Sequence, residues 1–189
     1  MRKLKITELN RIDKETFKET PKIPLRIVLD NVRSLHNVGS VFRTSDAFLI
    51  EKIYLCGITA TPPHAEIHKT ALGAEDTVDW QYAEDTKQVV AELKAEGYTV
   101  LAIEQAESST MLDAFQPEAD KKYAVILGNE VKGVQQEVMN LCDGCLEIPQ
   151  FGTKHSLNVS VTAGIVIWDF FRKMKTYLFF MLCLFTFLT

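Results

Sequence analysis

Cysteine and glycine are both sparse in this chain of 189 residues. It has four cysteines, and its charged N-terminal stretch lacks the apolar segment of a signal peptide, so we expect a reducing cytoplasm. No two of the nine glycines lie two positions apart, which excludes the G-x-G turn with which Rossmann folds hold a dinucleotide. Any nucleotide-like cofactor must therefore be held by turns of another kind.

Metal ligands are equally scarce. Cys142-Asp-Gly-Cys145 is a CxxC pair, but it follows a helical pattern and precedes a strand, whereas a thioredoxin motif follows a strand and opens a helix. A zinc site needs two further ligands, and only His64 and His68 form a suggestive pair. We therefore expect no metal site, and buried or free thiols at both cysteines.

Long apolar runs are also few. The longest one, 177–189, is shorter than the about 20 residues that a helix needs to cross a bilayer. Arg172, Lys173 and Lys175 prevent its extension backward. We therefore expect no membrane span. Packing onto the body, a subunit contact and an atypical end of the reading frame all remain open for this segment.

Positive charge is scarce over most of the chain but gathers at its beginning. The net charge is −4, yet residues 1–43 carry +5 and the remainder carries −9. A basic arm on an acidic body can steer a phosphate backbone to one face, which favours a nucleic-acid partner. A solvated helical face explains the same charges equally well. Charge alone therefore leaves the partner open.

Strand-like and helix-like segments alternate along the sequence. Short apolar runs predict strands, and apolar residues at helical spacing predict helices between them. The expected strands are 25–29, 52–56, 77–82, 98–103, 123–127 and 146–148; the expected helices are 37–48, 85–95, 134–141 and 157–173, after a charged helical arm at 1–22. This alternation is typical of an α/β domain with a mostly parallel sheet and helices on both faces. The longest loop, 104–122, is polar.

Ligands of such sheets bind beyond the carboxyl ends of the strands, where three loops of this chain are unusual. They read DNVRSLHNVGSVFR from residue 30, GNEVKGV from residue 128 and IPQFGTKHSLN from residue 148. The second loop has the two glycines of a phosphate-binding P-loop. However, Val134 and Gln135 stand where that motif needs a lysine and a hydroxyl side chain. The sequence therefore excludes a P-loop NTPase.

Together the three loops resemble the signature motifs of the SpoU (TrmH-like) family of SPOUT RNA methyltransferases. Asn37-x-Gly39-x-x-x-Arg43 resembles the first motif, Leu127-Gly-Asn-Glu130-x-x-Gly133 the second, and Ile148-Pro149 with Ser156-Leu157-Asn158 the third. The combination is specific because all three occur in order, at the ends of successive strand-like segments. The resemblance covers about residues 25–174 and includes the stretch KTALGAE at 69–75.

The resemblance implies a fold and an assembly. It implies a deep C-terminal trefoil knot, which periodicity alone would predict against because knots are rare. It also implies a homodimer with the active site near the subunit interface and S-adenosylmethionine bound in the knot. The chain then divides into a basic arm at 1–24, a methyltransferase domain at 25–174 and an apolar tail at 175–189. Many relatives carry a separate N-terminal RNA-binding domain, whereas this chain has only a short basic arm. We therefore expect the arm and the dimer surface to recognise the RNA, as in the tRNA-modifying members, which favours tRNA as substrate.

By the same resemblance, five side chains serve catalysis: Arg43, Asn37, Glu130, Ser156 and Asn158. The methyl group arrives activated, so the enzyme must mainly orient the ribose hydroxyl and help remove its proton. An arginine stays protonated in proteins, so we expect Arg43 to clamp a substrate phosphate rather than to act as a base. Helix capping is the alternative role of Asn37, Ser156 and Asn158.

Six residues are assigned to the cofactor by resemblance: Gly128, Ile148, Leu157, Glu104, Asn129 and Gly133. Backbone groups of Gly128, Ile148 and Leu157 are expected to hold it, with apolar side chains against the adenine. Lys154 and His155 adjoin the third motif and are candidates for RNA contact. Trp80 and Trp168 are expected in the core or an interface.

We therefore predict a cytoplasmic enzyme that methylates the ribose 2′-hydroxyl of one nucleotide in structured RNA. Ribosomal RNA is the alternative substrate to tRNA. A non-catalytic RNA-binding protein that keeps the fold is a further alternative, but such a protein has no need of all five catalytic side chains. The target nucleotide is not readable from the sequence.

Overall fold

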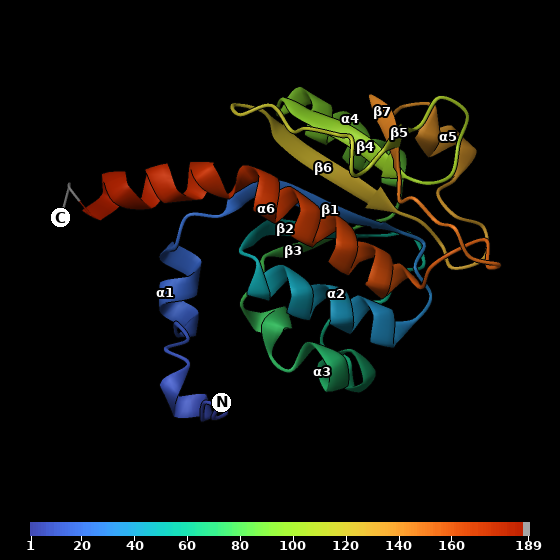
Figure 1. Ribbon diagram of the computed structural model, residues 1–189. Helices are drawn as coiled ribbons and strands as arrows, with labels where there is room; N and C mark the ends of the chain where they lie inside the picture. The colour runs from blue at the N-terminus through green and yellow to red at the C-terminus, as the bar shows by residue number, and fades with distance from the viewer. Residues whose placement is uncertain (187–189) are drawn as a thin grey trace.

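Seven parallel strands form one sheet in the computed structural model, which describes the backbone of residues 1–186 and the side chains other than those of residues 6 and 175–186 (Figure 1). The strands are β1 (Ile23–Asp30), β2 (Ile50–Cys56), β3 (Trp80–Ala83), β4 (Tyr98–Ile103), β5 (Thr110–Met111), β6 (Lys122–Leu127) and β7 (Gly144–Glu147). Their order across the sheet is β3-β2-β1-β6-β4-β7-β5, and every neighbouring pair is parallel. The predicted parallel sheet is confirmed.

Helices cover both faces of this sheet. α2 (Leu35–Ala47), α3 (Ala65–Ala71) and α6 (Val159–Thr186) lie on one side, and α4 (Thr86–Ala95) and α5 (Gln136–Met139) lie on the other (Figure 1). The alternation of side chains along a strand explains the two layers. Ile27 and Leu29 of β1 join the core beneath α2 and α6, whereas Val28 joins the core beneath α4. An apolar run such as 25–29 therefore buries both of its faces.

Several element boundaries differ from those predicted. α3 was not predicted, because one short helix with a single buried isoleucine, Ile67, gives no periodic signal. The loop predicted at 104–122 contains the two-residue strand β5. α5 has only four residues because Gln135 is still extended. α6 runs to Thr186 rather than ending at residue 173, while side chains of the predicted tail 175–189 lie outside the described residues.

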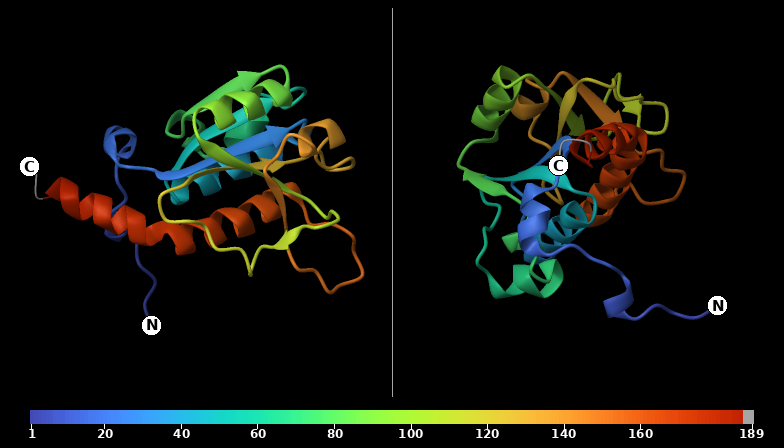
Figure 2. Two further views of the ribbon diagram at one scale, coloured as in Figure 1. Left: turned by 90° about the horizontal axis from the view of Figure 1, so that it is seen from above. Right: turned by 90° about the vertical axis from the view of Figure 1, so that its left-hand side faces the viewer.

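The predicted arm is only partly helical. It contains a 3-10 turn at Ile6–Glu8 and the short helix α1 (Lys14–Glu19). Phe17 of α1 is 4% exposed and packs into the core beneath α2, so the second half of the arm is attached to the body. The arm and the far half of α6 leave the body at the same end, as Figure 2 shows from two sides. Among the described residues, no helix meets the length and hydropathy of a membrane span.

Candidate active site

A cavity of about 840 Å³ opens at the carboxyl ends of β4, β6 and β7. Its walls come mainly from residues 103–108, 127–134, 144–150 and 155–162. The second and third motif loops therefore share one cavity, as expected for the carboxyl edge of a parallel sheet. Its volume lies in the range of small-molecule sites, about 300–1,000 Å³.

A chain of hydrogen bonds joins all three motif loops beside this cavity. Glu130 accepts from the backbone N–H groups of Arg33 and Ser34 at 3.0 and 2.9 Å. Its Oε1 also accepts from Nδ2 of Asn37 at 3.1 Å. Asn37 Oδ1 in turn accepts from Nδ2 of Asn158 at 3.1 Å. Residues far apart in the sequence thus form one hydrogen-bonded unit.

The ionisation of Glu130 follows from these contacts. Partial burial opposes the charged form, but the N–H groups of Arg33, Ser34 and Asn37 stabilise it, and the pKa of Glu130 lies below its ordinary value. The carboxylate is therefore ionised at neutral pH, and both of its oxygens already accept hydrogen bonds. This arrangement suits a group that holds loops in place better than a free general base.

Ser34 rather than Asn37 caps α2. The helix begins at Leu35, and the Ser34 hydroxyl accepts from the backbone N–H of Asn37 at 3.3 Å. The expected capping role of Asn37 is therefore wrong, because the helix starts earlier than predicted. Its amide, in the first turn of α2, is left to join Glu130 to Asn158.

Asn158 combines the two roles expected for it. Its Oδ1 accepts from the backbone N–H groups of Ser160 and Val161 at 2.8 and 3.4 Å, which caps α6. Its Nδ2 donates to Asn37, so the same side chain belongs to the polar unit. Ser156, two residues earlier, is exposed and lines the cavity.

Two glycines shape the turn of the second motif. A Cβ at Gly128 would lie 2.1 Å from backbone atoms of Gly133 and Val134, so the two sides of the turn pack backbone against backbone. Gly133 has a φ of +66°, and a Cβ there would lie 2.1 Å from Oε2 of Glu104. That oxygen accepts from the backbone N–H of Val134 at 3.2 Å. Larger residues at these positions would open the turn.

All six residues expected at the cofactor line the same cavity, namely Gly128, Ile148, Leu157, Glu104, Asn129 and Gly133. Asn129 organises the turn from inside. Its Oδ1 accepts from the backbone N–H groups of Val131 and Lys132, and its Nδ2 donates to the carbonyl of Asn31. The turn of the second motif is thereby attached to the loop that follows β1.

Arg43 is not among the residues that line the cavity. It stands in the second half of α2, is exposed, and has no carboxylate partner within the part of the chain that the structure describes. Gly39, in the same motif, serves packing, because a Cβ there would lie 2.1 Å from Oγ1 of Thr70 and 2.3 Å from the carbonyl oxygen of Ile67 in α3. Of the first motif, only Asn37 joins the polar unit.

One residue near the site was not predicted. Asp30, at the end of β1, is fully buried and accepts from Oγ1 of Thr86 at 2.6 Å and from Nε2 and the backbone N–H of Gln135. It therefore holds the end of the second motif loop against α4. The signal in the sequence was an acidic residue that closes a largely apolar strand.

The CxxC cysteines are ordinary thiols. Burial raises the pKa of Cys142 to about 11 and also raises the pKa of Cys145, so both stay protonated at neutral pH. Cys145 lines the cavity, and its Sγ donates to the carbonyl of Glu104 at 3.3 Å. Among the residues whose side chains are described, no group of three His, Cys, Asp or Glu could hold a metal ion.

The structure has a parallel α/β sheet with a ligand-sized cavity and a polar cluster at its carboxyl edge. These features are typical of α/β proteins that bind a small molecule beyond the carboxyl ends of their strands. The family is given by direct comparison. The model of the SpoU rRNA Methylase family matches residues 24–168. The chain belongs to this family, and the resemblance of its three motifs is confirmed.

Relatives named for ribosomal RNA are among the similar proteins. The 23S rRNA (guanosine-2′-O-)-methyltransferases RlmB of Nitrosomonas europaea and Neisseria meningitidis are 34% and 31% identical over 149 and 150 residues, 79% of this chain in each case. The chain spans 56% and 59% of the length of these two relatives.

Solved structures share the fold. The TrmH/SpoU tRNA modifying enzyme of A. aeolicus has a TM-score of 0.74 and 26% identity, covering 85% of this chain and 79% of that one. An AdoMet-bound rRNA methyltransferase from Sinorhizobium meliloti has a TM-score of 0.74 and 25% identity, covering 82% of this chain and 59% of that one. The α/β fold predicted for the chain is thus that of the SpoU/TrmH structures.

Proposed function

We propose that this protein transfers a methyl group from S-adenosylmethionine to the ribose 2′-hydroxyl of a nucleotide in structured RNA, in the cytoplasm. The observation that carries the proposal is that the second and third family motifs share one cavity and that Glu130, Asn37 and Asn158 join them to the first motif by hydrogen bonds. The names of the RlmB relatives state the same chemistry for those proteins.

S-adenosylmethionine, when bound, supplies a methyl group that is already activated on a sulfonium sulfur. The residues present fit such a molecule, because the cavity is of suitable size and the glycines at 128 and 133 expose backbone on one part of its wall. Backbone groups of Gly128, Ile148 and Leu157 hold it in this proposal, and Glu104, Asn129 and Gly133 keep the turn in shape. AdoMet is bound in the neighbour from S. meliloti.

Transfer forms a bond between the methyl carbon and the 2′ oxygen, breaks the carbon–sulfur bond, and releases the hydroxyl proton. Glu130 has no unoccupied oxygen, so we assign it to positioning. Ser156, exposed on the cavity wall, is placed to orient the ribose. Arg43 clamps a phosphate of the RNA, and that phosphate or a neighbouring group takes the proton.

Substitution of Arg43 tests the catalytic proposal against a protein that only binds RNA. Arg43→Ala should abolish methyl transfer and change the affinity for S-adenosylmethionine by no more than a few-fold, because Arg43 does not line the cavity. Incorporation of a labelled methyl group and calorimetric titration measure the two quantities. Lys121→Ala, a surface cation before β6, is the matched control. Unchanged turnover in Arg43→Ala would refute the assigned role.

The RNA class is the finer part of the proposal. Relatives are named for both 23S rRNA and tRNA, so their names do not support one over the other. Mapping 2′-O-methyl groups in total RNA from a deletion strain decides the question. A methyl group lost from tRNA or from 23S rRNA identifies the substrate, and restoration by the plasmid-borne gene is the control.

The proposed enzyme acts as a homodimer. α6 presents the apolar side chains Val161, Ile165 and Trp168 on an exposed stripe, with exposed fractions from 37% to 51%. These residues recur at spacings of four and three, so they lie on one side of the helix. An apolar stripe of this kind is typical of a surface that a second subunit covers.

A further inference from the structure

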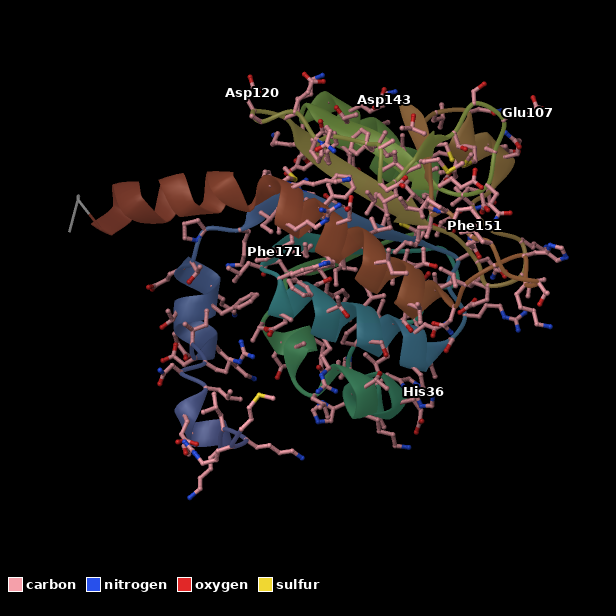
Figure 3. The ribbon with its side chains drawn as sticks, viewed as in Figure 1. His36, Glu107, Asp120, Asp143, Phe151 and Phe171 are labelled. Atoms are coloured by element: carbon pink, nitrogen blue, oxygen red, sulfur yellow. The ribbon has the colours of Figure 1, made fainter. Side chains whose placement is uncertain are left out.

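The rim of the cavity carries an aromatic side chain that the proposed reaction does not use. Phe151, in the loop between β7 and α6, is 96% exposed. Its neighbours Gln150 and His155 line the cavity, so the loop borders the opening directly. Figure 3 shows Phe151 at the loop end of the molecule, on the side away from Asp120. On the second motif loop, Val131 lines the cavity and is 77% exposed.

Three cations stand on the same three loops. Arg33 follows β1, Lys132 follows β6 and Lys154 follows β7, and each is exposed. None of them forms an ion pair with a carboxylate in the described part of the chain. By contrast, surface lysines elsewhere, such as Lys94 and Lys121, are paired with acids. Three unpaired positive charges therefore lie on loops at the carboxyl edge of the sheet, on a protein whose net charge is −4.

Hydrogen bonds keep these loops together. The backbone N–H of Arg33 donates to Glu130, two residues before Lys132. The Nε2 of Gln105 donates to the carbonyl of His155 at 3.0 Å, which attaches the loop of Phe151 and Lys154 to the opposite wall. The loops that carry the aromatic ring and the three cations are thus held together at the edge of the sheet where the cavity opens.

We propose that this rim, formed by Phe151, Val131, Arg33, Lys132 and Lys154, binds an unpaired stretch of RNA. Phe151 stacks on a base next to the target nucleotide, and the three cations contact phosphates. The inference rests on the proposed function and adds that the target lies in a loop or another single-stranded region. Bases in such regions can be splayed out and stacked on aromatic rings, which a continuous duplex does not permit.

Charge favours RNA over a second protein surface as the occupant. The centres of protein–protein interfaces are depleted in charged residues, because buried charges lose their hydration. Here three unpaired cations stand on the loops at the same edge of the sheet as the exposed ring. Phosphates neutralise such cations, while the ring takes the face of a base of any identity.

Substitution of the ring tests the stacking contact. Phe151→Ala should weaken binding roughly 5- to 100-fold, since base–aromatic stacking contributes at this level. The salt dependence of the affinity should stay the same, because the ring carries no charge. Phe151→Tyr should restore binding. Tyr82→Ala, at an exposed aromatic of the edge strand β3, is the matched control. The probes are unfractionated tRNA and a transcript of 23S rRNA, measured by fluorescence anisotropy.

Substitution of the cations tests the phosphate contacts. Lys132→Gln and Lys154→Gln should each lower the slope of log affinity against log salt by about 0.7–0.9, as expected for one lost phosphate contact. Lys121→Gln, whose lysine precedes β6 and so lies at the amino edge of the sheet, should leave the slope unchanged. Equal slopes for wild type and both rim variants would contradict the contacts.

The outcomes separate this inference from the proposed function. If the wild type transfers methyl groups to RNA and Phe151→Ala binds that RNA equally well, the rim proposal is wrong and the proposed function stands. If Phe151→Ala instead dissociates a dimer, or weakens only S-adenosylmethionine binding, the ring has another occupant and the rim proposal is again wrong. If the wild type transfers no methyl group to either RNA, the proposed function itself fails.

Discussion

The Glu130 carboxylate joins the loop after β1 to the loop after β6 through hydrogen bonds to Arg33, Ser34 and Asn37. We expect Glu130→Gln to lower the free energy of unfolding at neutral pH by about 1–3 kcal/mol, because hydrogen bonds to a charged acceptor are stronger and a glutamine has only one accepting oxygen. Urea titration measures the difference. Glu137→Gln, at an exposed carboxylate paired with Lys87, is the control with a small effect.

The same side chain predicts a pH dependence. The pKa of Glu130 in the folded protein lies below its ordinary value of 4.5, so its stabilising effect is complete above that value and is lost as the pH falls through the folded-state pKa. The difference in free energy of unfolding between the wild type and Glu130→Gln should therefore become smaller at acidic pH. If this difference in free energy of unfolding is the same at neutral and at acidic pH, the charge of Glu130 is not the cause of the stabilisation.

The helices α2 and α3 pack closely at Gly39, where α2 has no side chain. A Cβ at Gly39 would overlap Thr70 and the carbonyl of Ile67, so Gly39→Ala should lower the free energy of unfolding by about 1–2 kcal/mol, despite the higher helix propensity of alanine. Thermal and urea unfolding measure the change. Gly164→Ala in α6 is the matched control, because nothing lies within 4 Å of its Cβ position. It should raise stability by about 0.5–1 kcal/mol, and a similar gain at Gly39 would contradict the packing argument.

The basic arm and the cavity lie at opposite ends of the subunit. The arm leads into the start of β1, whereas the cavity lies at the carboxyl edge, and the eight residues of β1 span roughly 25 Å. If the arm binds RNA, it does so far from the reacting ribose of its own subunit. Replacing Lys3, Lys5 and Arg11 by glutamine should flatten the salt dependence of RNA binding without changing affinity for S-adenosylmethionine.

That triple substitution is a cleaner test than removal of residues 1–22, since removal would also take away Phe17, which packs in the core. Filter binding over a series of salt concentrations gives the slope, with Lys121→Gln as the control. A slope identical to that of the wild type would show that the arm makes no phosphate contact.

The proposed homodimer is tested on the apolar stripe of α6. Val161→Glu places a charge within the apolar stripe of α6, so sedimentation should show a shift from dimer to monomer. Gln88→Glu, at an exposed position of α4 on the other face of the sheet, should leave the mass unchanged. A wild-type protein that sediments as a monomer would rule out the dimer directly.

The amino-acid sequence alone determined the layered architecture and indicated which loops line the cavity. Runs such as 25–29 and 123–127 are apolar except for Arg26, and strands buried on both faces suit them, so the parallel sheet followed from the apolar pattern along the chain. The second and third motifs marked the loops that line the cavity, and all six predicted cofactor residues lie there. The trefoil knot, implied by the family, stays a prediction.

Only the tertiary structure decided which of these residues meet. The chain from Glu130 through Asn37 to Asn158, the buried Asp30 between α4 and α5, and the place of Arg43 outside the cavity all depend on contacts between distant segments. The periodicity of apolar residues indicates which face of a helix or strand is buried, because this pattern repeats within a few residues. It carries no information on which loop a side chain reaches, because that depends on how the strands are ordered in the sheet.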